Sequence, residues 1–188
     1  MRKGLCFGLA VAAAVLGAAV TSDAFTATSK FRLIENERVP PGSKVTIHQD
    51  ELNAYVRAQV REVAPDGVRD PRVELGQSRA TGFAWVDFEK LRRAQGQPMG
   101  WLMARLIGGE KPVRVDAQIR SGGGKAVVDV QRVEVSGVAI SGPALDFLIR
   151  NFLWSYYPEA KVGRPFELAH RIERLDVQPE RVNVVIGK

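Results

Sequence analysis

The side chains suited to acid–base or metal chemistry are sparse in this chain, which has two histidines and one cysteine. His48 and His170 have no second histidine at the spacing of metal ligands, and the sequence contains neither an HExxH motif nor a cysteine cluster. This pattern favours structural roles, a helix cap for His48 and a sheet-edge position for His170. We predict neither a metal site nor a cofactor.

The serines that lie next to glycines lack the surroundings of a catalytic nucleophile. A nucleophilic serine of the hydrolase type lies on a strained turn between two glycines, whereas Ser136 and Ser141 have glycine on one side only. Residues 121–125 (Ser-Gly-Gly-Gly-Lys) lack the spacing of a phosphate-binding loop. Asp116 and Asp129 offer a carboxylate pair of the kind that glycoside hydrolysis needs, but they alternate with arginine and glutamine, as on a solvated strand face. We therefore predict no catalytic residue and no enzyme.

The charge balance bears on the class of partner. The formal net charge is +6 and the isoelectric point is about 9.8, which makes anionic partners candidates. The arginines are scattered, and no basic stripe alternates with aromatic residues as a nucleic-acid site requires. We predict no nucleic-acid partner and keep the anionic membrane surface as a candidate.

The first 24 residues have the pattern of a secretory signal peptide. Arg2 and Lys3 give a short positive start, residues 5–20 form an unbroken apolar run, and residues 22–24 offer small side chains for cleavage after Ala24. The run is shorter than the roughly 20 residues of a membrane-spanning helix, and it would tether the protein if it stayed uncleaved. We expect residues 25–188 to form one domain, periplasmic or secreted, without cysteine because Cys6 lies in the signal segment.

Hydrophobic periodicity predicts the elements of this domain. Residues 49–63 have the apolar spacing of a helix, and residues 113–120 alternate as a strand that returns after a glycine-rich loop as a second strand, 126–135. Apolar residues change parity near Gln131-Arg132, which predicts either a β-bulge or a strand that turns a corner, and both favour a curved sheet. Residues 166–186 predict a C-terminal hairpin, and residues 25–44 an irregular lead-in with one edge strand.

One helix in the C-terminal half organises the fold. Residues 141–157 include Pro143, which suits a first helical turn, and they are followed directly by Pro158, which suits a stop. One stripe of this helix carries six apolar residues at helical spacing, and Phe147 and Trp154 share the opposite side. We predict an α+β fold with a curved antiparallel sheet wrapped around this long amphipathic helix, and a second helix near the N-terminus.

The excess of large apolar residues suggests a ligand. Residues 99–107 are dense in large apolar side chains and end at two glycines, as a flap over a pocket or a short core helix would. A pocket for an acyl chain is mostly apolar with a few polar groups, and arginines at its mouth, Arg105 or Arg150, could pair with an anionic head group. The expected ligand-binding residues are Trp101, Met103, Leu106, Phe147, Arg150 and Trp154. The alternative is an interaction or assembly module of the cell envelope with a filled core and no ligand.

Two stretches carry a resemblance to a known group of proteins. They are residues 47–56 (IHQDELNAYV) and residues 133–149 (VEVSGVAISGPALDFLI), the latter followed by Pro165–Leu168 and Ile172–Val177. The chain resembles small exported bacterial envelope proteins of the LmeA and YpmS groups, which are distantly similar to tubular lipid-binding (BPI-like) domains. The resemblance implies a curved sheet around a long helix and a lipid or other hydrophobic small molecule as partner. It implies no catalytic residue, and many such chains have serine or threonine in place of His48.

Overall fold

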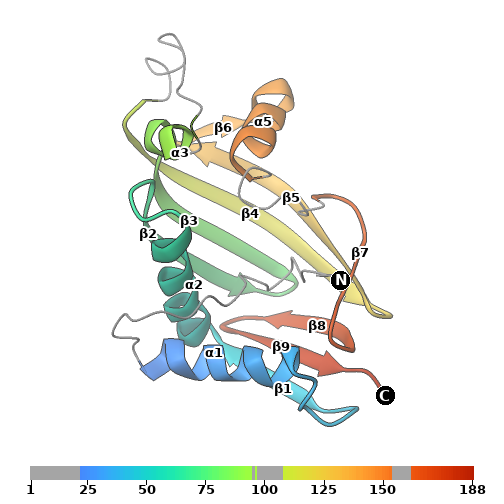
Figure 1. Cartoon of the computed structure of the whole chain (residues 1–188). Helices are drawn as coiled ribbons and strands as arrows, with labels where there is room; N and C mark the ends of the chain where they lie inside the picture. Colours follow the sequence, from blue (N-terminus) through green and yellow to red (C-terminus); the bar gives the residue numbers. More distant parts are fainter. Residues whose placement is uncertain (1–21, 95, 97–107, 154–161) are drawn as a thin grey trace.

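The computed structural model describes residues 22–94, 96, 108–153 and 162–188, and it has an α+β fold (Figure 1). The helices are α1 (Ser22–Glu35), α2 (Gln49–Val63), α3 (Phe88–Ala94) and α5 (Gly142–Leu148), the last continued by the π-helix η1 (Ile149–Leu153). The strands are β1 (Lys44–His48), β2 (Val68–Gly76), β3 (Arg79–Asp87), β4 (Glu110–Gly122), β5 (Lys125–Val135), β6 (Val138–Ile140), β7 (Phe166–Glu167), β8 (Ile172–Gln178) and β9 (Arg181–Ile186). Within these described residues, no helix is both long and apolar enough to cross a bilayer.

The strands form two antiparallel sheets, where the sequence predicts one. Strands β2-β3-β4-β5-β6 follow one another in a large sheet, to which β7 adds by pairing with β5, and β1-β9-β8 form a second sheet of three strands. The predicted C-terminal hairpin is confirmed, but its strand β9 pairs with β1 rather than with the large sheet. The two sheets meet where the Ser121 hydroxyl donates to the Leu175 carbonyl at 2.9 Å and accepts from the Leu175 amide at 2.8 Å. Apolar periodicity identifies strands but not distant strand partners, which explains the difference.

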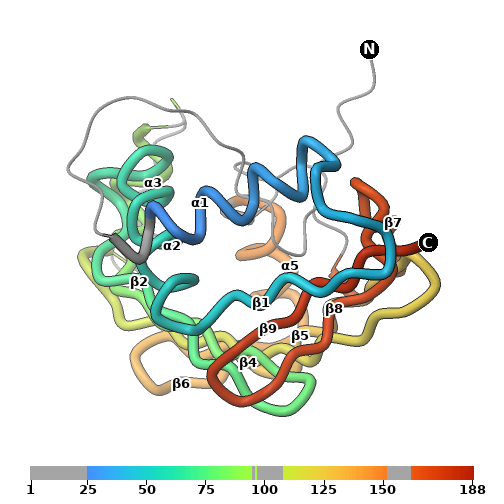
Figure 2. The backbone as a smooth tube through the Cα atoms, turned by 90° about the horizontal axis from the view of Figure 1, so that it is seen from below, coloured from blue at the N-terminus to red at the C-terminus, as the bar shows by residue number. Residues whose placement is uncertain are grey.

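The irregular lead-in predicted for residues 25–44 is wrong over residues 25–35, which belong to helix α1, whereas residues 36–43 are irregular as predicted. Ala27, Phe31 and Ile34 follow helical spacing, and all three are buried. The rings of Phe31 and Tyr55 lie 4.5 Å apart between centroids and join α1 to α2. Figure 2 shows these two helices gathered with α3 on one side of the strands.

Helix α2 has the predicted bounds, and it protects the edge of the large sheet. The Asn53 side-chain amide donates to the Val73 carbonyl at 2.9 Å and accepts from the Val73 amide at 2.6 Å. One turn earlier, the Gln49 side-chain oxygen accepts from the Leu75 amide at 2.6 Å. Because an unpaired strand edge invites pairing with another chain, these two side chains stand in for a neighbouring strand along β2.

A β-bulge lies in β5, where the change of parity predicts it. Asp116 pairs with Arg132 and Ala117 pairs with Val130, so that Gln131 is the extra residue. In a regular strand, residues three apart face opposite sides of the sheet. The bulge instead turns Val130 and Val133 to the same face, which becomes important at the pocket described below.

The outer face of the large sheet carries paired charges. Arginines and acids two residues apart share one strand face and form ion pairs, as in Arg114–Asp116 at 3.0 Å and Arg132–Glu134. Phe83 lies between the guanidinium groups of Arg72 and Arg114, at 4.4 and 5.5 Å from its ring centroid. Because these charges are paired, the described part of the outer face carries no basic stripe, although the chain has a net positive charge.

The helix of the C-terminal half lies over one end of the large sheet (Figure 1). Its described part is the seven-residue α5 followed by the five-residue π-helix η1. Pro143 lies in its first turn, as predicted, and residues 154–157 of the predicted helix lie outside the described residues. The coarse α+β prediction is confirmed, while a sheet wrapped around a long helix stays a prediction.

Candidate ligand-binding pocket

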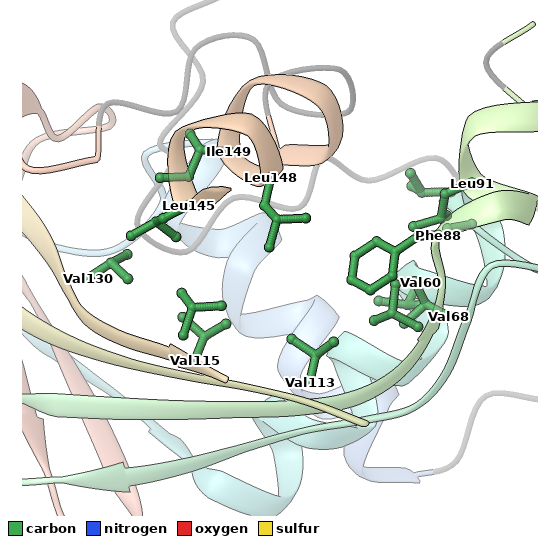
Figure 3. A pocket seen from close by; sticks show the side chains of 14 residues that line it. Val60, Val68, Phe88, Leu91, Val113, Val115, Val130, Leu145, Leu148 and Ile149 are labelled. Carbon is green, nitrogen blue, oxygen red and sulfur yellow. The ribbon is translucent and has the colours of Figure 1, made fainter. Parts of the chain in front are cut away.

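A pocket of about 330 Å³ lies between the large sheet and the helices α2, α3 and α5 (Figure 3). It draws residues from the inner face of the sheet, from the C-terminal end of α2, from α3 and from the α5–η1 segment. The described residues that line it are apolar: Val60, Val63, Ala64, Val68, Val86, Phe88, Leu91, Val113, Val115, Val130, Val133, Leu145, Leu148 and Ile149. Small-molecule sites are concave, mostly apolar and of about 300–1,000 Å³, and this pocket lies at the small end of that range.

The floor of the pocket follows from strand register. Val115 pairs with Val133 across β4 and β5, and the bulge at Gln131 adds Val130 to the same face. On the other side of Val115, the paired residue of β3 is Gly82, which has no side chain to fill the space. The bulge and the glycine thus leave an apolar floor with little side-chain bulk beside Val115.

The floor valines are less buried than inward-facing valines elsewhere in the molecule. Val113, Val115 and Val130 are only half-buried, although they lie on the dry face of the large sheet. Val182 and Val184, on β9 in the smaller sheet, are 2% and 1% exposed. Apolar side chains on an inward face are normally closely packed, so the partial exposure of these three valines marks a part of the face that the described residues do not fully cover, whereas the fourth floor valine, Val133, is buried.

Helix α3 forms one wall and is held by local features of the sequence. The Asp87 carboxylate accepts a hydrogen bond from the Lys90 amide at 2.9 Å and so caps the N-terminus of the helix. Gly67 lies so close to Leu91 that a Cβ at Gly67 would stand 2.2 Å from a Leu91 methyl carbon. A side chain at position 67 would therefore push Leu91 out of its place in the wall.

The α5–η1 segment covers the pocket with Leu145, Leu148 and Ile149 (Figure 3). The Arg92 guanidinium donates to the Asn151 side-chain oxygen at 3.1 Å, which links α3 to η1. The Asn151 amide nitrogen in turn donates to the Phe147 carbonyl at 2.8 Å. The two walls are thus joined by a polar bridge beside an otherwise apolar space.

The residues expected at a ligand site have different outcomes. Phe147 is half-buried and packs against the cluster of Val86, Phe88 and Leu91, but the set of residues lining the pocket does not include it. Arg150 is exposed, and its Nε donates to the Asp146 carbonyl at 3.3 Å. The other four expected residues, and Arg105 of the suggested flap, lie outside the described residues: Trp101, Met103, Leu106 and Trp154.

Sequence reasoning missed most of the lining residues because it assigned them to the core. Leu145, Leu148 and Ile149 belong to the helix stripe expected to pack on the sheet, and Val113 and Val115 to the dry strand face. Both surfaces are apolar as predicted, but a space separates them. The parity change at the bulge was the one available signal, because it sets two valines side by side on one face.

The titratable groups with shifted pKa values lie away from this pocket. Hydrogen bonds from Arg114 and Thr81 hold the pKa of the Asp116 carboxyl below its ordinary value, and Asp116 is one of the paired charges on the outer face of the large sheet. A hydrogen bond from Arg69 lowers the pKa of Glu110 at the end of β4. Among the residues that the structure describes, no three histidine, cysteine, aspartate or glutamate side chains gather as a metal site requires.

The chain matches no model of a known protein family, and comparisons with curated proteins and with solved structures found no similar protein. The resemblance to the LmeA and YpmS groups stays a prediction.

Proposed function

We propose that this protein binds a lipid or another hydrophobic ligand between the large sheet and the helix of its C-terminal half. The observation that supports this proposal is the pocket of about 330 Å³, whose described lining residues are all apolar. Its size suits one acyl chain or a molecule of similar bulk better than a two-chain lipid buried whole. Burial of a chain there gains free energy in proportion to the apolar surface removed from water, about 25 cal/mol per Å².

The proposal includes export from the cytoplasm, because the first 24 residues have the composition of a signal peptide. An exported protein meets acyl chains at membranes, and a net positive charge favours approach to an anionic membrane surface. The sheet wrapped around a long helix, as in tubular lipid-binding domains, is part of the same proposal. The position of the described part of α5 and η1 against the pocket supports this part of the proposal.

Native mass spectrometry of protein purified without detergent from cells that express the full chain tests the proposal. We expect a bound species of lipid mass on the wild-type protein. Leu148→Asp places a charge on the pocket wall and should abolish the bound species. Leu33→Asp is the matched control, because Leu33 is 46% exposed on α1 and is not among the residues that line the pocket.

The competing function is an assembly module with no ligand. It predicts clean apo-protein from wild type and from both variants. It also predicts that no acyl compound added to the purified protein raises its unfolding temperature, since a ligand stabilises only the state that binds it.

A further inference from the structure

Three helical segments border the pocket, and they are anchored to the rest of the fold to different degrees. Helix α2 has buried residues and pairs through Asn53 with the edge of β2, and α3 buries Phe88 and Leu91. Helix α5, all of which the structure describes, buries no residue, although Leu145 and Leu148 line the pocket. Because a segment opens most easily where few of its apolar contacts are buried, α5 is the wall of the pocket that opens at the lowest free energy.

The backbone at both ends of α5 favours such an opening. Gly142, the first residue of α5, has a φ of +56°, and a Cβ at this position would meet no atom of the described residues within 4 Å. A glycine in open space can absorb the change of backbone angles that a hinge requires. At the other end, Ile149 lines the pocket from within the π-helix η1. Because π-helical turns are rare and frequently occur at functional sites, the position of η1 over the pocket points to a functional role for this turn.

We propose that residues 142–153 form a gate of the pocket and that the hydrogen bond from Arg92 to Asn151 is the latch of this gate. This inference rests on the proposed function. In the closed gate, Arg92 Nη1 lies 3.1 Å from the Asn151 side-chain oxygen, and this contact joins the gate to α3. When the gate moves away from the large sheet, the contact breaks and the apolar residues of the gate separate from the valines of the floor. The ligand then enters between α5 and the sheet.

A latch has a kinetic signature that a direct contact with the ligand lacks. The hydrogen bond is present in the closed gate with and without ligand, and it is absent in the open gate. Its loss therefore lowers the barriers to ligand entry and to ligand exit equally. The association and dissociation rate constants should change together while the dissociation constant stays the same, whereas a side chain that touches the ligand changes mainly the dissociation rate.

Two substitutions at position 151 change the strength of the latch in opposite directions. Asn151→Ala removes the acceptor of the Arg92 hydrogen bond, whereas Asn151→Asp replaces it with a carboxylate, which binds a guanidinium group more strongly. Both variants lose the amide group that donates to the Phe147 carbonyl, so the difference between them reports on the contact with Arg92.

Stopped-flow fluorescence measures both rate constants with N-phenyl-1-naphthylamine, a neutral dye that fluoresces in apolar pockets. We expect both rate constants to be about threefold to tenfold higher in Asn151→Ala than in Asn151→Asp, with the same dissociation constant. Glu89→Ala is the matched control, because it breaks the 2.6 Å contact between Arg93 and Glu89 within α3 and should leave both rate constants at their wild-type values. Equal rate constants in the two Asn151 variants overturn the inference, and so does a difference confined to the dissociation rate.

Hydrogen exchange of the ligand-free protein separates failure of the gate from failure of the proposed function. The amides of residues 145–153 should exchange faster than the hydrogen-bonded amides of α2 and α3, and faster in Asn151→Ala than in Asn151→Asp. Equal protection of α5 and α2 overturns the gate even if the dye binds. If the dye does not bind the wild-type protein, the proposed function fails, and the gate fails with it as a route for a ligand.

Discussion

Replacing a floor valine with phenylalanine distinguishes a pocket from a filled core. Val115 is half-buried, lines the pocket and pairs with Gly82, so a larger ring at position 115 has space above it and beside it. The ring of Val115→Phe would bury roughly 40 Å² of additional apolar surface, worth about 1 kcal/mol at ~25 cal/mol per Å². We expect the free energy of unfolding to stay unchanged or to rise by up to ~1 kcal/mol, and affinity for an acyl ligand to fall about tenfold or more as the space fills.

Val184→Phe is the matched control for this substitution. Val184 is 1% exposed at the centre of the smaller sheet, where it faces Val45 and Leu175 on the neighbouring strands. Overpacking of a filled core lowers the free energy of unfolding by about 1–3 kcal/mol. Urea denaturation followed by circular dichroism measures both variants, and dye displacement measures binding. The reasoning is refuted if Val115→Phe destabilises the protein as much as Val184→Phe does, because Val115 would then lie in filled core.

Three further predictions concern the elements around the pocket. Asn53→Asp should lower the free energy of unfolding, measured by urea titration, by about 1–3 kcal/mol, because aspartate cannot donate a hydrogen bond to the β2 edge. Gln49→Glu keeps its acceptor and should lower the free energy of unfolding less. Equal losses of stability in the two variants would contradict the edge-pairing role. Gly67→Ala should displace Leu91 and weaken dye binding in a fluorescence titration, and unchanged affinity would show that the wall adjusts freely. Burial opposes ionisation of Glu51, but hydrogen bonds and the charge of its partner Lys30 outweigh this effect and lower the pKa of Glu51 below 4.5. The contribution of ionised Glu51 to the free energy of unfolding is therefore complete above pH ~4.5 and is lost as pH falls through the lowered pKa. In Glu51→Gln the urea midpoint should depend less on pH over that window, and an unchanged pH dependence would contradict this prediction.

Elements with a strong local pattern were predictable from the sequence. The helix 49–63 has a full apolar stripe with acids in its first turn, and the structure gives it the same bounds. The parity change near Gln131 predicted a bulge or a strand that turns a corner, and the strand register shows that the bulge is the one that occurs. Helix α1 was missed because its three buried residues are separated by threonines, serines and charged residues, so that its stripe is weak.

The pocket was less predictable than the elements that form it. Periodicity shows that a face is apolar, but not whether another side chain covers it. The sequence placed Leu148 on an apolar helix stripe and Val115 on a dry strand face, but it left open whether a ligand or closely packed side chains fill the space between them, and the structure has a pocket there.

Methyl nuclear magnetic resonance tests the central claim most directly. Protein labelled at valine and leucine methyl groups is titrated with dodecanoic acid below its micelle concentration. Ligand binding in the pocket predicts shifted resonances and contacts to the acyl chain for Val113, Val115 and Leu148, with Val182 and Val184 unchanged. Spectra that do not change, or shifts confined to the valines of the smaller sheet, would contradict a ligand between the large sheet and α5.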